Sequence, residues 1–244
     1  MSSKLTDQHY LTTDQYRDSS NIDARIALHQ QFSTNPYGWF NWVFDMLSRL
    51  PANAIVLELG CGSGTIWKEC AHRIPAGWVI TLSDLSDGML DAAWRNLVVT
   101  GRNFKFEQID AQSIPYPDGT FEVVIANHML YHVPDRPKAI SEIRRVLRTG
   151  GHLMATTVGE GHLKQLDEWV RRFTHQDYDS FAVDLFTLEN GMSQLMPYFS
   201  KVELYHYEDS LQVTEIDPLM AYIHSSLRAK QFSESALKEL QAEL

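Results

Sequence analysis

The 244-residue chain is predicted to be an α/β protein in which a parallel sheet is covered by helices on both faces. Short apolar segments indicate buried strands, because both faces of a parallel strand lie against helices. Segments with apolar residues at helical spacing alternate with these strands along the chain. The first strand also ends in a run of glycines, which is typical of a tight turn into a following helix.

Two helices are expected before the sheet. Residues 1–20 are polar and lack a period, which predicts an arm without regular structure. Apolar residues at helical spacing then predict helices over 22–32 and 40–50. The residues Asn35-Pro36-Tyr37-Gly38 separate them, since proline disfavours helix in the residue before it.

The sheet itself is expected in the middle of the chain. Strands are predicted at 54–59, 78–82, 104–109, 121–126 and 152–157. Helices are predicted between them at 66–71, 85–97 and 139–147. Beyond residue 157 the pattern predicts a helix at 163–173, a short helix after Gly191, strands at 201–207 and 211–214, and an amphipathic tail at 227–244.

Composition narrows the possible partners. The 31 acidic residues outnumber the 21 basic ones, and the formal net charge is -10. A general nucleic-acid clamp needs a basic surface, so nucleic acid is disfavoured as a partner. Two cysteines, no apolar leader and no membrane-spanning run favour a cytoplasmic protein without a membrane partner. Nothing in the sequence indicates an oligomeric state.

The sharpest motif lies where the first strand ends. Three alternate glycines, Gly60, Gly62 and Gly64, follow the apolar strand directly. Such a turn lets the backbone approach a ligand closely. Asp84 ends the next strand, where an acid can accept hydrogen bonds from both ribose hydroxyls of an adenosine. The alternative is a structural turn accompanied by a surface aspartate.

Five segments, in order, resemble a known family. The segment Glu58-Leu-Gly60-Cys-Gly62-Ser-Gly64 resembles motif I of the class I S-adenosylmethionine (SAM)-dependent methyltransferases, in particular the type 11 or UbiE-like group that acts on small molecules. The segments at 84–90, 110–121, 127–135 and 145–151 are similar to the later motifs, with Thr149 in place of a proline. The resemblance implies a Rossmann-like, doubly wound sheet of about seven strands whose last strand is antiparallel.

The resemblance also implies a SAM site, with S-adenosylhomocysteine as the product. Asp84 is expected to hold the ribose, Asp110 the adenine amine and Glu58 the glycine turn or the amino-acid part. Met89 either packs on the adenine or belongs to the core. The full expected set of cofactor-binding residues is Glu58, Gly60, Cys61, Gly62, Asp84, Leu85, Met89, Asp110, Ala111 and Asn127.

Two histidines follow the fourth strand. His128 and His132 are four residues apart, but no third ligand besides Asp135 lies nearby, so no metal site is expected. Each is a candidate catalytic base, because imidazole titrates near neutral pH. His132 matches a histidine that related small-molecule enzymes carry in this loop. The alternative for each is a loop histidine hydrogen-bonded to backbone.

These observations predict methyl transfer from SAM to oxygen, nitrogen or carbon of a small-molecule acceptor. The segment 126–129 lacks the Asn/Asp-Pro-Pro-Tyr/Phe motif of enzymes that methylate amines of bases or glutamine, and there is no Pro-Cys pair typical of cytosine-C5 enzymes. Two alternatives stay open: a SAM-binding regulatory or accessory protein, and a SAM-fold enzyme whose net reaction is not methyl transfer.

Three units are expected along the chain. Residues 1–50 form an N-terminal arm and helical lid, residues 51–215 the SAM-binding domain, and residues 216–244 a helical tail. The lid is suggested by the aromatic residues Phe32, Tyr37, Trp39, Phe40 and Trp42. These side chains either pack in the core or close over SAM and the acceptor. Tyr16 and Arg25 are candidates to reach the SAM carboxylate.

Overall fold

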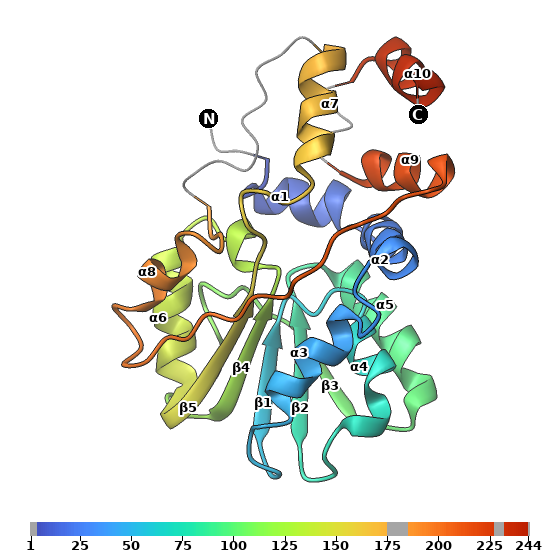
Figure 1. Cartoon of the computed structure of the whole chain (residues 1–244). Coiled ribbons are helices and arrows are strands. Elements are labelled where there is room, and N and C mark those ends of the chain that lie inside the picture. The colour runs from blue at the N-terminus through green and yellow to red at the C-terminus, as the bar shows by residue number, and fades with distance from the viewer. Residues whose placement is uncertain (1–3, 175–184, 227–231, 244) are drawn as a thin grey trace.

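The computed structural model describes residues 4–174, 185–226 and 232–243 and confirms the α/β prediction (Figure 1). The five strands are β1 (Ile55–Leu59), β2 (Val79–Asp84), β3 (Phe104–Gln108), β4 (Phe121–Asn127) and β5 (Leu147–Thr156). They form one parallel sheet in the order β3-β2-β1-β4-β5. This is the Rossmann-like arrangement.

Helices cover both faces of the sheet. On one face lie α3 (Trp39–Leu47), α4 (Thr65–Glu69) and α5 (Asp87–Leu97), and on the other lies α6 (Arg136–Val146). Short 3₁₀ turns occur at Ala71–Arg73, Val98–Thr100 and Leu130–His132. Val56 packs with α4 while its neighbour Leu57 packs with α6, as expected for a strand buried on both sides.

The strand order reverses beside β1. The chain runs outward from β1 through β2 to β3, and then returns to place β4 on the other side of β1. In an open parallel sheet, a crevice for ligands forms at the carboxyl ends of the two strands where the order reverses. The glycine turn follows β1 and Asn127 ends β4, so both lie at this crevice.

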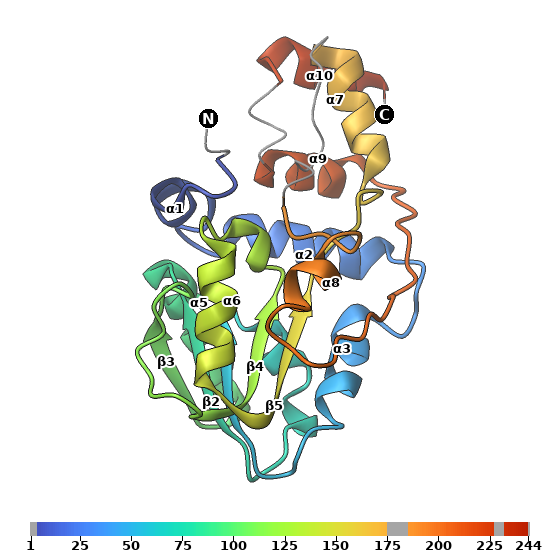
Figure 2. The same cartoon turned by 90° about the vertical axis from the view of Figure 1, so that its left-hand side faces the viewer.

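A helical layer lies above the carboxyl ends of the strands (Figure 2). It contains α1 (Gln8–Tyr10), a π-helical turn (Leu11–Gln15), α2 (Ser20–Phe32) and α9 (Ile216–Ser225). Leu28 of α2 packs with Ile223 of α9 in a separate apolar cluster that also receives Leu166 and Leu240. The prediction of an irregular arm over residues 1–20 is therefore wrong for residues 8–15.

The remaining helices of the described residues are α7 (Lys164–Thr174), α8 (Gly191–Leu195) and α10 (Glu234–Glu243). The predicted tail at 227–244 lies partly outside the described residues. In the described part of the chain, no helix is both long and apolar enough to cross a bilayer.

The sheet of the described residues has neither the sixth strand nor the antiparallel seventh strand that the resemblance implies. All five strands in the described part of the chain are parallel, and residues 199–215 run as an extended strap from α8 to α9 (Figure 1). Leu211 makes an isolated bridge with Ser33, and the strap is held to the end of α2 by backbone hydrogen bonds. Leu204 and Tyr205 are 42% and 48% exposed, so this segment lacks the buried face that pairs a strand into a sheet.

Candidate active site

The glycine turn after β1 requires backbone that other residues rarely adopt. Gly60 and Gly62 have φ of 71° and 53°, in the left-handed region. A Cβ at Gly60 would also lie 2.8 Å from the Cβ of Met129, and one at Gly62 would lie 3.0 Å from Ile22. The turn therefore brings β1, the loop after β4 and α2 together as closely as glycine allows.

Asp84 fixes this turn from the end of β2. Its carboxylate accepts hydrogen bonds from the backbone N–H of Gly62 at 3.0 Å and of Ser86 at 2.9 Å. Burial raises the pKa of Asp84, and these backbone hydrogen bonds oppose that effect. A carboxylate offers about four acceptor sites, so Asp84 can still accept from a ligand hydroxyl.

Glu58 links the ends of β1 and β4. Its buried carboxyl accepts hydrogen bonds from the Trp67 indole and, at 3.0 Å, from the Asn127 amide. Burial raises the pKa of Glu58 to about 7, although both hydrogen bonds favour the ionised form. Glu58 therefore changes charge near neutral pH beside the glycine turn.

Asp110 follows β3 and already has partners within the chain. Its carboxylate accepts hydrogen bonds from the backbone and side chain of Gln112, and from the Gln8 amide at 3.2 Å. Burial raises the pKa of Asp110, but these hydrogen bonds outweigh burial and lower it overall. A ligand amine that binds Asp110 would replace the amide of Gln8. Gln8 belongs to the N-terminal segment, residues 4–19, which precedes α2.

All ten predicted cofactor-binding residues line one cavity of about 2210 Å³. Met89 and Ala111 are buried in its wall, as is Cys61, whose thiol faces the Gly62 carbonyl at 3.6 Å. Leu85 contributes its carbonyl as acceptor for the Gln108 amide. Single-ligand pockets commonly measure roughly 300–1,000 Å³, so this cavity has room for a nucleoside and a second molecule.

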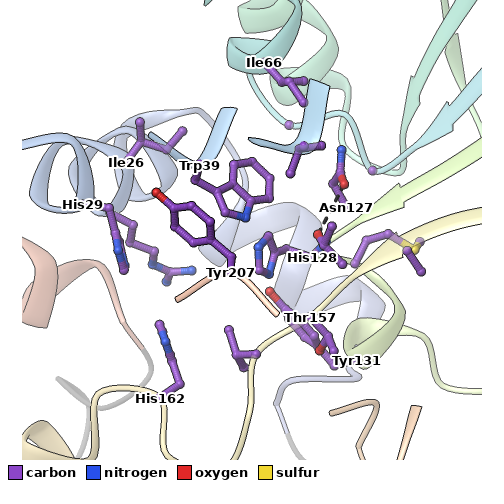
Figure 3. A pocket seen from close by; sticks show the side chains of 18 of the residues that line it. Ile26, His29, Trp39, Ile66, Asn127, His128, Tyr131, Thr157, His162 and Tyr207 are labelled. Carbon is purple, nitrogen blue, oxygen red and sulfur yellow. Dashed lines mark hydrogen bonds between the residues drawn. The ribbon is translucent and has the colours of Figure 1, made fainter. Parts of the chain in front are cut away.

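The part of the cavity beyond Asn127 is aromatic (Figure 3). Trp39, His128 and Tyr207 surround one space, with His29 and His162 at its far side. Tyr207 comes from the strap, and its buried hydroxyl has no hydrogen-bond partner among the described residues. Tyr37, by contrast, is half exposed and donates to Asp45, away from this space.

His128 presents its ring to this space. Its φ of 49° is unusual for a residue other than glycine, and its backbone N–H donates to the Thr156 carbonyl at 3.1 Å. The ring lies 5.2 Å from that of Trp39 and has no hydrogen bond within the described residues. Burial lowers the pKa of His128 to about 4, so the imidazole is neutral at pH 7.

His132 is differently placed, because both ring nitrogens have partners. Nδ1 lies 2.8 Å from the Leu5 carbonyl, which can only accept, so Nδ1 carries the proton. Nε2 then accepts from the Tyr16 hydroxyl at 2.9 Å, and that hydroxyl in turn accepts from Arg25 at 3.3 Å. Burial lowers the pKa of His132 to about 4.

Several residues of this site carried no sequence signal. Leu5 and Gln8 contact His132 and Asp110 from a polar segment without a motif, and Tyr207 comes from a predicted strand. Tyr16 and Arg25 do line the cavity, as the sequence suggested. In the described part of the chain, no group of three or more metal-ligating side chains occurs.

Comparison with known proteins finds similarity in the part of the chain that contains the sheet. Residues 57–155 match the family described as methyltransferase domain. A ubiquinone/menaquinone biosynthesis C-methyltransferase UbiE from Hahella chejuensis is 31% identical over 118 residues, 48% of this chain and 47% of that protein. Its counterpart from Pasteurella multocida is 39% identical over 103 residues, 41% of this chain and 38% of that protein. The chain thus spans less than half the length of these relatives.

Solved structures show the same fold at low sequence identity. MccD protein shares 19% identity with a TM-score of 0.58, over 83% of this chain and 86% of that one. A putative methyltransferase from Bacillus halodurans shares 20% identity with a TM-score of 0.50, over 64% of this chain and 67% of that one. The motifs and the fold agree with the family match, so residues 57–155 are similar to a methyltransferase domain.

Proposed function

We propose that this protein transfers the methyl group of SAM to a small-molecule acceptor. The observation that carries the proposal is the convergence of Glu58, Asp84, Asp110 and the glycine turn on one cavity that has room for both molecules. The net charge of -10 favours a small acceptor over nucleic acid. The relatives are named as C-methyltransferases of quinone biosynthesis, so an acceptor carbon is the first to test. That the protein acts in the cytoplasm stays a prediction.

The residues present fit SAM. The Asp84 carboxylate suits the two ribose hydroxyls, and Asp110 suits the adenine amine once the Gln8 amide withdraws. Glu58 and Asn127 lie at the reversal of strand order, where they would hold the glycine turn around the amino-acid part. When bound, SAM supplies a methyl group activated by a positively charged sulfur.

The contribution of the chain to the reaction is mainly positioning. The aromatic side chains beyond Asn127 form a wall that would hold the acceptor against the methyl group and exclude water. Effective molarities on the order of 10⁵–10⁸ M are attainable from such alignment in an in-line displacement. Trp39 presents a ring in this wall, and aromatic faces attract positive charge such as that of a sulfonium.

His128 is better placed than His132 to take a proton from the acceptor. Its imidazole is neutral, faces the aromatic space and has no hydrogen bond within the described residues. Nε2 of His132 is occupied by the Tyr16 hydroxyl, so a proton could reach it only through Tyr16. We assign the base to His128, and we assign to His132 the role of positioning Tyr16 and the N-terminal segment.

The N-terminal segment, with α2 and α3, forms the lid of this site. Tyr16 bonds to Ser86 after β2, Gln8 to Asp110 after β3, and Leu5 to His132 after β4. The segment therefore crosses three of the loops that would enclose SAM. SAM exchange would require these contacts to open, and reclosure would exclude water from the reacting groups.

The test is transfer of a labelled methyl group. Wild-type protein incubated with methyl-labelled SAM and a small-molecule extract should release S-adenosylhomocysteine and move the label into a low-mass product. Asp84→Ala protein serves as the matched control and should lose most of this transfer. SAM binding without release of S-adenosylhomocysteine would instead indicate a regulatory or accessory protein. If the acceptor is converted but no S-adenosylhomocysteine is released and no labelled methyl group is transferred, the net reaction is not methyl transfer.

A further inference from the structure

Arg25 places a guanidinium in the wall of the cavity. It lies on α2, and its Nε donates to the Ser225 hydroxyl at 3.2 Å. One Nη donates to the Ser225 carbonyl and the other to the Tyr16 hydroxyl at 3.3 Å. The guanidinium carbon lies 5.9 Å from the centre of the Tyr16 ring. These contacts use three of the five N–H groups of the side chain.

No carboxylate lies within ion-pair distance of Arg25 in the described part of the chain. Arg73 and Arg145, which lie at the surface, pair with Asp45 and Glu142. Arginine stays protonated in proteins, so Arg25 carries a full positive charge into the cavity. Removing such a charge from water is costly unless an opposite charge compensates it.

The groups around Arg25 compensate only part of this charge. The Ser225 carbonyl ends α9, where the helix dipole supplies roughly half a negative charge. The Tyr16 and Tyr131 phenols are also close, and burial raises the pKa of Tyr131, which keeps that phenol neutral. The remaining N–H groups and the remaining charge are therefore available to a molecule bound in the cavity.

We propose that Arg25 is the anion-binding residue of this cavity and takes the carboxylate of a bound small molecule. A planar guanidinium matches a carboxylate with two parallel hydrogen bonds. The inference rests on the proposed function, because that function supplies the two possible sources. One is the amino-acid carboxylate of SAM itself, and the other is a carboxylate on the acceptor. Both present the same chemistry to Arg25.

The first experiment asks whether the carboxylate belongs to the cofactor. Binding of S-adenosylhomocysteine and of 5′-methylthioadenosine, which lacks the amino-acid part, is measured by calorimetry for wild type and Arg25→Gln. If Arg25 holds the cofactor, S-adenosylhomocysteine should bind about 10- to 100-fold more weakly to Arg25→Gln, while methylthioadenosine is unchanged. Arg17→Gln, on the same segment but with a side chain 74% exposed, is the matched control.

The second experiment asks whether the carboxylate belongs to the acceptor. Benzoate, phenylacetate and cinnamate suit the aromatic wall and are titrated, each against its uncharged amide, into protein saturated with S-adenosylhomocysteine. If Arg25 holds the acceptor, a carboxylate should bind wild type and Arg17→Gln but bind Arg25→Gln at least tenfold more weakly. The amides should not distinguish the variants. Binding of S-adenosylhomocysteine would then be the same in all three proteins.

One result overturns the proposal: neither S-adenosylhomocysteine nor any of the three carboxylates binds in a way that depends on Arg25. A lowered melting temperature alone would then show that Arg25 only holds the end of α9. Should Arg25→Gln fail to fold, Arg25→Lys keeps the charge but loses the paired hydrogen bonds, and smaller losses of the same kind are expected. If wild-type protein fails to bind S-adenosylhomocysteine, the proposed function is contradicted. The carboxylate titrations, carried out in the absence of S-adenosylhomocysteine, would still decide the role of Arg25.

Discussion

Gln8 and Asp110 show how single side chains connect the lid to the cofactor site. The Gln8 amide donates to the carboxylate that is expected to receive the adenine amine. An amide N–H₂ and an adenine amine present the same kind of donor, so the two compete for Asp110. Closing the lid onto this aspartate is therefore incompatible with adenine binding there, unless Gln8 withdraws.

Removing this competitor should strengthen cofactor binding. Gln8→Ala is expected to increase SAM affinity about 2- to 10-fold, because one hydrogen bond worth roughly 0.5–1.5 kcal/mol no longer has to break. Calorimetry on wild type, Gln8→Ala and Thr13→Ala measures this difference. Thr13 lies on the same segment, and within the described residues its hydroxyl bonds only to the His9 carbonyl, so its variant should match wild type. Weaker binding by Gln8→Ala would show that Gln8 contributes to the bound state instead.

Substitutions of the two histidines should differ in their effects on turnover and on SAM affinity. Asparagine tolerates the left-handed backbone of residue 128, so His128→Asn is the appropriate variant. It should lower turnover by about 10²–10⁴-fold if the acceptor must lose a proton, and leave SAM affinity nearly unchanged. His132→Asn should instead weaken SAM binding and lower the melting temperature, because Leu5 and Tyr16 lose their partner.

The reverse pattern would assign the role of catalytic base to His132. In that case His132→Asn would lose turnover at unchanged SAM affinity, and His128→Asn would remain active. Initial rates with a single identified acceptor and calorimetry with S-adenosylhomocysteine together decide between the two assignments.

Residues with local motifs were predictable from the sequence, whereas their distant partners were not. The glycine turn and the acids after β2 and β3 follow from the strand pattern, because parallel strands bring their carboxyl ends to one edge. The cavity does contain all ten predicted cofactor residues, and their role as SAM ligands stays a prediction. Gln8 and Leu5 reach this edge across more than a hundred residues of sequence, and nothing in their local sequence encodes that contact.

At the scale of elements, the N-terminal segment depends on a glycine in α5. A Cβ at Gly88 would lie 1.8 Å from the backbone oxygen of Arg17, so any larger residue must push the segment away. Nearby, Ser86 caps the start of α5 and also donates to the Tyr16 carbonyl. The start of α5 thus serves as the contact surface on which the lid closes.

Tryptic cleavage after Arg17 should report lid closure. The side chain of Arg17 is 74% exposed, but cleavage requires the surrounding backbone to open locally. Saturating S-adenosylhomocysteine should slow the cleavage, and Gly88→Ala should accelerate it without ligand. Arg17→Gln removes the site and identifies the fragment. Equal rates with and without ligand would show that residues 4–47 are core packing and no lid.

The strands were predicted well where they are buried and poorly where they are not. β1, β4 and β5 have apolar residues toward both helical layers, whereas β2 and β3 have them toward one layer, and these patterns indicate the strands. The segments at 201–207 and 211–214 carry strand-forming residues, but they run as a strap that is not part of the sheet. Whether such a segment pairs depends on the sheet edge available to it, which local sequence does not determine.

For the whole molecule, buried titratable groups predict how stability depends on pH. Burial lowers the pKa of His128 and His132 to about 4, from about 6.5 in an unfolded chain. Between these values the unfolded chain binds more protons, so stability present above pH 6.5 is lost as the pH falls toward 4. Glu58 acts oppositely, since its raised pKa stabilises the fold at low pH and that contribution is lost as the pH rises toward 7.

The effect of the two histidines on the pH dependence of stability should be larger than the opposite effect of Glu58. The melting temperature is expected to fall between pH 6.5 and pH 4.5, with each histidine contributing at most about 1.4 kcal/mol per pH unit. His128→Asn should reduce this dependence, while substitution of the exposed His72 by asparagine should not. A pH dependence that is identical in His128→Asn and wild type would show that His128 is not buried as described.

The central claim is that SAM binds across the carboxyl ends of the strands with its ribose on Asp84. Calorimetric titration of S-adenosylhomocysteine into wild type and a folded Asp84→Ala variant tests it most directly. Loss of the ribose hydrogen bonds should cost about 1.5–3 kcal/mol, which corresponds to roughly 10- to 150-fold weaker binding. Unchanged affinity in the folded Asp84→Ala protein would contradict the claim and remove Asp84 from the cofactor site.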